Sequence, residues 1–63
     1  MRYYTWDGMK LFRSVKSAAK YAVKHGLNPY SARILQHGKL QMPFDHEYDE
    51  LWETIHGLPL LHN

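Results

Sequence analysis

The stretch Ser14–Lys39, SVKSAAKYAVKHGLNPYSARILQHGK, decides the fold that the sequence predicts. Its first half has the pattern of a helix, because Ser14 can accept a hydrogen bond from a free N–H of the first turn and Gly26 can end the helix at a positive φ. Its second half starts with Asn28–Pro29, a typical N-cap followed by a typical first helical residue, and it ends at Gly38. Helix, glycine turn and short helix form the outline of a helix-turn-helix.

The residues before this stretch predict a β-hairpin over residues 2–13. The segments RYYTW and MKLFR flank Asp7–Gly8. An Asp-Gly pair favours a two-residue type I′ turn, because both of its positions need positive φ. On the face of the hairpin that we expect to be buried, this turn pairs Tyr4 with Leu11 and Trp6 with Met9.

The C-terminal part of the chain predicts a third helix, acidic and amphipathic, over residues 45–56. Asp45 is the expected N-cap, and Gly57 is placed to end the helix. The acids lie in the N-terminal half, where the helix dipole favours them. Apolar side chains recur at i, i+3, i+4 and i+7, at Tyr48, Leu51, Trp52 and Ile55.

Together these segments predict a single α+β domain over residues 1–63, with an N-terminal β-hairpin (2–13), a helix-turn-helix pair (14–38) and the acidic helix (45–56). Nine aromatic residues among 63 favour a packed core over a disordered chain. Beyond the last helix, Leu58, Leu60 and Leu61 can fold back onto that core. The expected core residues are Tyr4, Trp6, Met9, Leu11, Val15, Ala18, Ala19, Ala22, Ile34, Leu35, Tyr48, Leu51, Trp52 and Ile55.

The charges are divided along the chain. The net charge is +2, but all eight Lys and Arg residues lie within residues 1–39 together with a single acid, Asp7. The other five acids lie within residues 45–53. The basic part suggests a polyanionic partner. The acidic part suggests either a basic partner or neutralisation of the basic part within the same molecule.

The sequence holds no catalytic constellation, so we expect a non-enzymatic protein. His46 with Asp49 or Glu50 has ligand spacing on a helix, but two ligands on a solvated face do not form a tight zinc site. Ser14 and Ser31 fit helix starts and have no neighbouring base that would activate them. We therefore expect no catalytic residues, no metal site and no cofactor.

The location expected from the sequence is cytoplasmic. The chain has no cysteine, which argues against a disulfide framework. It has no run of about eighteen apolar residues, so we expect no contact with a membrane interior. Its start, MRYYTWDG, lacks the apolar segment of a signal peptide.

Double-stranded DNA is the partner that this pattern favours. In a helix-turn-helix, the second helix enters the major groove and the first crosses the backbone. On that geometry Arg33 suits guanine and Gln36 suits adenine, while lysines on the first helix hold phosphates. A lysine face that is merely solvated would have the same charge pattern. The candidate DNA-binding residues are Lys16, Lys20, Lys24, Tyr30, Ser31, Arg33, Gln36, His37 and Lys39.

Several features of residues 5–39 occur together, and they add to this hypothesis. They are the Asp7–Gly8 turn, Phe12, Ser14–Val15, Ala18–Ala19, Gly26 and Gly38–Lys39. In this combination the stretch resembles the nuclease-associated modular DNA-binding domain, a helix-turn-helix module appended to intron-encoded homing nucleases. The resemblance implies DNA binding, carried over chiefly to Ser31, Arg33 and Lys39. We expect the protein to be a small regulator of phage or prophage type.

A protein-docking module is the alternative function. The hairpin edge could extend a partner's sheet, and the acidic helix could occupy a basic surface, so that the protein inhibits or redirects a host enzyme. That function requires an exposed apolar patch or a free strand edge, with Tyr3 and Phe12 accessible. A homodimer is compatible with either function, because a small core gains from burying another surface and a two-fold protein suits paired half-sites.

Overall fold

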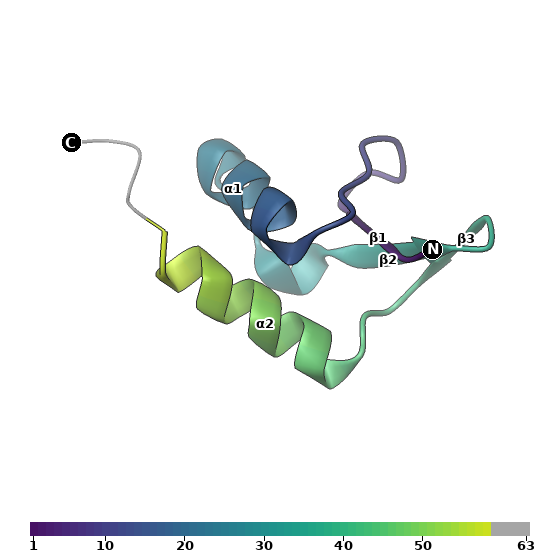
Figure 1. Ribbon diagram of the computed structural model, residues 1–63. Coiled ribbons are helices and arrows are strands. Elements are labelled where there is room, and N and C mark those ends of the chain that lie inside the picture. The colour runs from purple at the N-terminus through teal and green to yellow at the C-terminus, as the bar shows by residue number, and fades with distance from the viewer. Residues whose placement is uncertain (59–63) are drawn as a thin grey trace.

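The computed structural model describes residues 1–58, which form a short sheet with two helices at one end of it (Figure 1). The elements in chain order are β1 (Tyr3–Thr5), α1 (Val15–His25), the 3-10 turn η1 (Pro29–Ser31), β2 (Arg33–Gln36), β3 (Lys39–Gln41) and α2 (Asp45–His56). The class is α+β, as the sequence predicts. Within residues 1–58 neither helix is long and apolar enough to cross a bilayer.

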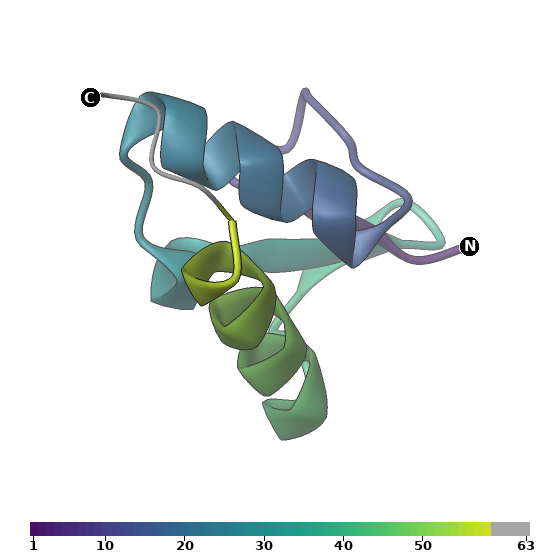
Figure 2. The same cartoon turned by 60° about the vertical axis from the view of Figure 1, so that its left-hand side comes forward.

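The sheet is antiparallel, with strand order β1-β2-β3. Tyr4 on β1 lies opposite Ile34 on β2, and Ile34 lies opposite Gln41 on β3. Because side chains alternate along a strand, these three share one face of the sheet. Tyr4 and Ile34 form the core with alanines of α1 and Leu51 of α2, so the helices cover this face. Figure 2 shows the two helices crossing one another beside the sheet.

The first predicted helix forms as α1. The Ser14 hydroxyl accepts a hydrogen bond from the Ser17 N–H at 3.1 Å, and Gly26 ends the helix at φ 64°. The buried side of the helix is made only of small residues, Ala18, Ala19 and Ala22. Small side chains let two packed elements approach closely. The helix α2 therefore packs directly on α1.

The second helix of the predicted pair does not form, so the helix-turn-helix prediction for residues 14–38 is wrong. Only the 3-10 turn η1 remains, started by the Asn28 side chain, which accepts a hydrogen bond from the Tyr30 N–H at 2.9 Å. Strands β2 and β3 follow as a hairpin, whose turn has positive φ at His37 (54°) and Gly38 (73°). Two positive φ values are the property of a type I′ turn. Gly38 thus serves a hairpin and not a helix end.

The N-terminal hairpin is reduced to one bridge. Tyr4 pairs with Phe12, one residue away from the expected partner, Leu11. The reason lies in Asp7, whose carboxylate accepts hydrogen bonds from the N–H groups two and three residues later, at 2.8 and 3.0 Å, and so opens a wide loop in place of a two-residue turn. The prediction that Met9 and Leu11 are core residues is wrong: their exposed fractions are 85% and 39%.

The acidic helix forms as α2, with the bounds that the sequence predicts, so two of the three expected helices are present. Its N-cap is Phe44 and not Asp45, because the Glu47 carboxylate accepts a hydrogen bond from the Phe44 N–H at 2.8 Å. Trp52, an expected core residue, has an exposed fraction of 41%. Of the leucines expected to fold back, Leu58 packs on the core, whereas residues 60 and 61 lie outside the described residues.

The remaining core predictions hold in large part. Ala32, which the sequence did not place in the core, is fully buried where the chain leaves η1 for β2. The buried apolar residues are Tyr4, Ala18, Ala19, Ala22, Ala32, Ile34 and Leu51. The expected core residues that pack partly buried against them are Trp6, Val15 and Ile55. Leu35 and Tyr48 are also partly buried.

Candidate nucleic-acid interface

The solvent side of α1 carries the lysine row, which consists of Lys16, Lys20 and Lys24. Residues four apart lie one above another on a helix, so the row follows the helix axis. All three side chains are exposed, because the alanines of α1 take the buried side of the helix. The row is therefore available to a large anionic partner along the whole length of α1.

The loop before α1 adds further positive charge to this region. Lys10 lies with its Nζ 5.7 Å from the ring centroid of Tyr21 on α1. Arg13 immediately precedes the N-cap residue and is exposed. Hydrogen bonds from the backbone N–H groups of Lys10 and Met9 lower the pKa of Asp7 and hold the loop in place.

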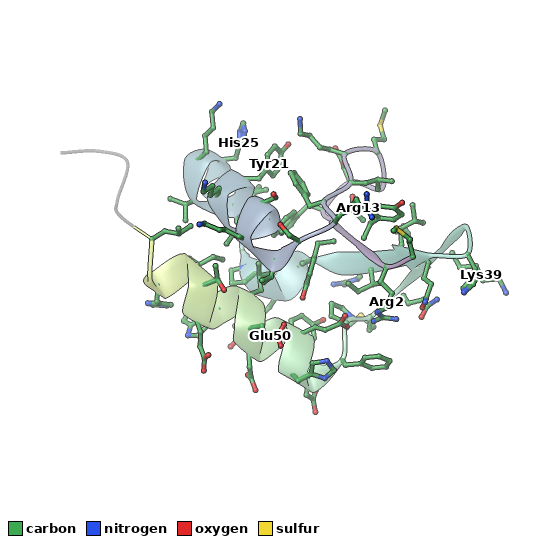
Figure 3. The ribbon with its side chains drawn as sticks, viewed as in Figure 1. Arg2, Arg13, Tyr21, His25, Lys39 and Glu50 are labelled. Carbon is green, nitrogen blue, oxygen red and sulfur yellow. The ribbon has the colours of Figure 1, made fainter. Side chains whose placement is uncertain are left out.

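A series of aromatic rings joins this loop to α1. The Phe12 and Tyr21 rings lie 4.8 Å apart, and the Tyr21 and His25 rings lie 4.3 Å apart. Trp6 contacts both Phe12 and Tyr21, and its indole N–H donates to the Asn28 carbonyl at 2.9 Å. Figure 3 shows Tyr21 and His25 on the side of α1 away from α2. These contacts fix Lys10 beside the helix. They also use the ring of Phe12 for packing, so it is only partly accessible.

In the described part of the chain, the positive charges of this region have no acidic partners in ion pairs. Residues 8–44 contain no Asp or Glu at all. Within residues 1–58 the one ion pair is between Arg2 and Glu47, far from the lysine row along the chain. Glu50, on α2, lies on the other side of the molecule from Tyr21 and His25 (Figure 3). The field of the lysine row is thus not cancelled by direct contacts.

The N-terminus of α1 adds backbone donors to the same surface. Ser14 satisfies the Ser17 N–H, but within residues 1–58 the N–H groups of Val15 and Lys16 have no acceptor. No acid lies in the first turn of the helix. Free N–H groups and the positive end of the helix dipole both favour a phosphate at such a position.

The residues expected to read bases do not share this surface. Arg33 lies on β2 next to Ile34, so it points to the sheet face that the helices leave uncovered. Its guanidinium donates to the carbonyl of Ala32 at 2.8 Å. Gln36 accepts a hydrogen bond from Arg2 at 2.8 Å. The single basic surface expected from Arg33 and the lysine row is therefore not formed.

The other expected contact residues are also dispersed. Tyr30 and Ser31 lie on η1, where the Tyr30 ring packs against the acidic helix, 5.7 Å from Trp52. His37 lies in the type I′ turn. Lys39 projects from the far end of the sheet, away from α1 (Figure 3). Of the nine predicted residues, only Lys16, Lys20 and Lys24 lie on the solvent side of α1. The others lie on η1, on β2, on β3 or in the β2–β3 turn, where Arg33 donates to the Tyr30 carbonyl at 3.4 Å and Gln36 pairs with Lys39.

Arg2 and Glu47 form a second polar cluster, with a structural role. The Arg2 guanidinium donates to both carboxylate oxygens of Glu47, at 2.6 and 3.1 Å, and lies 4.4 Å from the Phe44 ring centroid. Burial acts to raise the pKa of Glu47, but the hydrogen bonds from Arg2 and Phe44 outweigh it, and the pKa is lowered. The same hydrogen bond raises the pKa of Arg2. Burial, helped by nearby carboxylates, raises the pKa of Tyr4 to about 12.

Comparisons with known proteins add no functional information: no family model matches the chain, and neither a curated protein nor a solved structure matches it. The resemblance to the nuclease-associated module stays a prediction from the sequence. Sequence reasoning missed Lys10 and the ring series beside it. The absence of acids over residues 8–44 was the signal that could have pointed to Lys10.

Proposed function

We propose that this chain is a small, non-enzymatic DNA-binding protein that contacts the phosphate backbone through the solvent side of α1. The observation that carries the proposal is the exposed lysine row in a stretch of 37 residues, 8–44, without one acid. When lysines on one side of a helix bind DNA phosphates, they displace the counterions condensed on the DNA. The release of these counterions supplies affinity that does not depend on base sequence.

The geometry of α1 supports contacts to successive phosphates. A helix rises about 1.5 Å per residue, so neighbouring lysines of the row lie about 6 Å apart. This spacing is close to the separation of consecutive phosphates on one strand, and flexible lysine stems adjust the remainder. The free N–H groups at the start of α1 offer one further phosphate position.

The proposal differs from the helix-turn-helix mode that the sequence predicts. The second helix of the predicted pair does not form, because residues 29–38 hold η1, β2 and the turn after it. The side chains of Arg33 and Gln36 already have hydrogen-bond partners within the protein. Specific reading of guanine or adenine by these two residues is therefore not part of the proposal. Binding through α1 alone should depend strongly on salt and weakly on base sequence.

Titration of a fluorescently labelled duplex with the protein, followed by anisotropy over a series of salt concentrations, tests the proposal. Lys20→Ala should weaken binding to every sequence and reduce the slope of log K against log salt by about 0.9, the value for one phosphate contact. Lys39→Ala is the matched control, because Lys39 is exposed but lies away from α1. An equal loss in both variants, or no binding at low salt, would refute the proposal.

Protein docking is a second candidate function, supported by the free edge of β3. Within residues 1–58, β3 pairs only with β2, whereas β1 has a bridge to Phe12 on its outer side. Leu40 and Met42, at this edge, are exposed. An extended partner segment could add to such an edge as a fourth strand. The strand has only three residues, so few main-chain hydrogen bonds are available to hold a partner.

A further inference from the structure

The outer side of α2 carries an aromatic surface, in which Trp52 and His56 are exposed and Tyr48 is partly buried. Tyr48, Trp52 and His56 are four residues apart and follow one another along the helix, with the Trp52 and His56 rings 4.3 Å apart. Tyr30 joins them from η1, 5.8 Å from Tyr48 and 5.7 Å from Trp52 between ring centroids. Tyr30 has an exposed fraction of 59%. Large aromatic rings left in water at one place mark an interaction surface.

An acidic row borders these rings on the same helix. It consists of Asp45, Asp49 and Glu53, which are again four residues apart. Counting about 100° per residue from the buried Leu51, the acidic row lies directly outside the aromatic row. All three carboxylates are exposed, and within residues 1–58 none of them takes part in an ion pair. The surface thus combines exposed rings with unpaired negative charge, which suits a cationic partner.

The lysine row of α1 has matching geometry. Both rows hold three charges at four-residue intervals, so both have a spacing of about 6 Å along a helix axis. Within one molecule α1 and α2 pack through their buried sides, with Ala18 and Leu51 in the shared core, so the two rows face outward. They can therefore meet only between two molecules.

We infer that the acidic-aromatic surface of α2 binds the lysine row of α1 on a second copy of this chain. The lysine stems would cover the rings of Tyr30 and Trp52, while the ammonium groups reach the acidic row and the ring faces. Exposed ion pairs are individually weak and are screened by salt, so the association is weak and salt-sensitive. Each copy has both surfaces, so the contact is head-to-tail and extends into chains or closes into rings.

This association uses the lysines that the proposed function assigns to DNA, but it does not rest on that function. It is measured in the absence of nucleic acid, so failure of one proposal leaves the other intact. If both hold, DNA and a second copy compete for the lysine row. Duplex DNA added to the assembled protein should then lower the amount of assembly.

Sedimentation velocity over a range of protein concentrations tests the inference. The wild type should sediment faster as its concentration rises at about 50 mM salt and should return to a monomer at about 500 mM salt, where the Debye length is several-fold shorter. A basic-face variant combines Lys16→Ala with Lys20→Ala. An acidic-face variant combines Asp49→Asn with Glu53→Gln. Each of these neutralised variants alone should remain monomeric.

An equimolar mixture of the two variants is the decisive sample. One variant keeps an intact acidic row and the other keeps an intact lysine row, so the mixture should form a 1:1 dimer and nothing larger. Neutral substitutions are used because charge reversals on both surfaces could create a new attractive pair. Lys39→Ala, on β3 and outside both surfaces, is the matched control and should assemble like the wild type.

Three outcomes would overturn the inference. The first is a wild type that stays monomeric at low salt. The second is a basic-face or acidic-face variant that still assembles on its own, and the third is a mixture of the two that stays monomeric. Association through the free edge of β3 would give the second of these outcomes, because neither variant alters β3. Far-ultraviolet circular dichroism shows whether a variant is folded. If a double variant is unfolded, the single variants Lys20→Gln and Asp49→Asn take its place. Each of them should assemble more weakly than the wild type, and a mixture of the two should assemble more strongly than either one alone.

Discussion

Replacement of Glu47 by alanine should destabilise the protein by about 2–3 kcal/mol at neutral pH. The carboxylate receives two hydrogen bonds from Arg2 and one from the Phe44 N–H. Exposed ion pairs contribute about 0.2–1 kcal/mol and hydrogen bonds to charged groups about 1.5–3 kcal/mol. With side chains 26% and 12% exposed, the Arg2–Glu47 pair lies between these classes, at about 1–2 kcal/mol. Loss of the helix-start hydrogen bond adds about 1 kcal/mol.

This cost is large for so small a protein, because Arg2 ties three elements together. It joins the segment before β1 to α2 through Glu47 and to β2 through Gln36. Native domains have about 0.05–0.15 kcal/mol of stability per residue, so the whole chain has about 3–9 kcal/mol. A loss of 1 kcal/mol lowers the Tm of a domain this size by about 4–8 °C. Glu47→Ala should therefore lower the Tm by about 10–20 °C in a thermal melt followed by circular dichroism.

The effect of pH gives this prediction a second test. The pKa of Glu47 is lowered in the folded protein from its ordinary value of 4.5, so the unfolded chain binds the proton at a higher pH than the native state does. The stabilisation is complete above the ordinary pKa and is lost as the pH falls through the folded-state value. The difference in Tm between the wild type and Glu47→Ala should shrink between about pH 6 and pH 3.

The matched control is Glu53→Ala, which removes an exposed acid from the same helix. Surface changes of this kind are usually within about 0.5 kcal/mol of the wild type. A double-mutant cycle with Arg2→Gln should return a coupling energy of about 1–2 kcal/mol for the pair. The reasoning is refuted if Glu47→Ala and Glu53→Ala melt together at neutral pH, or if their separation does not change on acidification.

Two further predictions concern the core and the β2–β3 turn. Leu51→Ala should lower the free energy of unfolding by about 2–5 kcal/mol, because Leu51 is fully buried. Trp52→Ala should lower it less, because Trp52 is 41% exposed. Equal losses of unfolding free energy in urea would contradict the exposed placement of Trp52. His37→Asn should stabilise the protein by about 0.5 kcal/mol and His37→Val should destabilise it by about 1–2 kcal/mol, because His37 has a φ of 54° that Asn tolerates and a β-branched side chain does not. Similar unfolding free energies for both variants would argue against a type I′ turn.

The two helices were predictable because their signals are long and local. Tyr48, Leu51 and Ile55 repeat at helical spacing over about two turns, and no competing pattern overlaps them. For α1, Ser14 and Gly26 supply a start and a stop that depend only on nearby backbone. Such signals do not need a tertiary partner, so sequence reasoning places both helices and the exposed lysine row of the candidate site correctly.

The β2–β3 hairpin was not predictable in the same way. Residues 33–36 are too few for a helical period to be told from a strand period, and Gly38 suits a helix end as well as a hairpin turn. What decides the outcome is pairing with β1, a contact about 30 residues away that buries Ile34 against Tyr4. The error carried over to the site, because the base-reading roles of Arg33 and Gln36 depended on a helix there.

The separation of charge follows from how the two helices bury themselves. The helix α1 turns its alanines inward, and α2 turns Leu51 and Ile55 inward, so the charged residues of both helices have to face solvent. Direct contact between the lysine row and the acidic row of one molecule would have required the two helices to meet through their charged sides. That arrangement would leave the buried faces in water, at a cost of about 25 cal/mol for each Å² of apolar surface. Exposed ion pairs are too weak to offset this free-energy cost. Burial of the small core thus keeps the two charge rows apart, and it leaves each available to a partner of opposite charge.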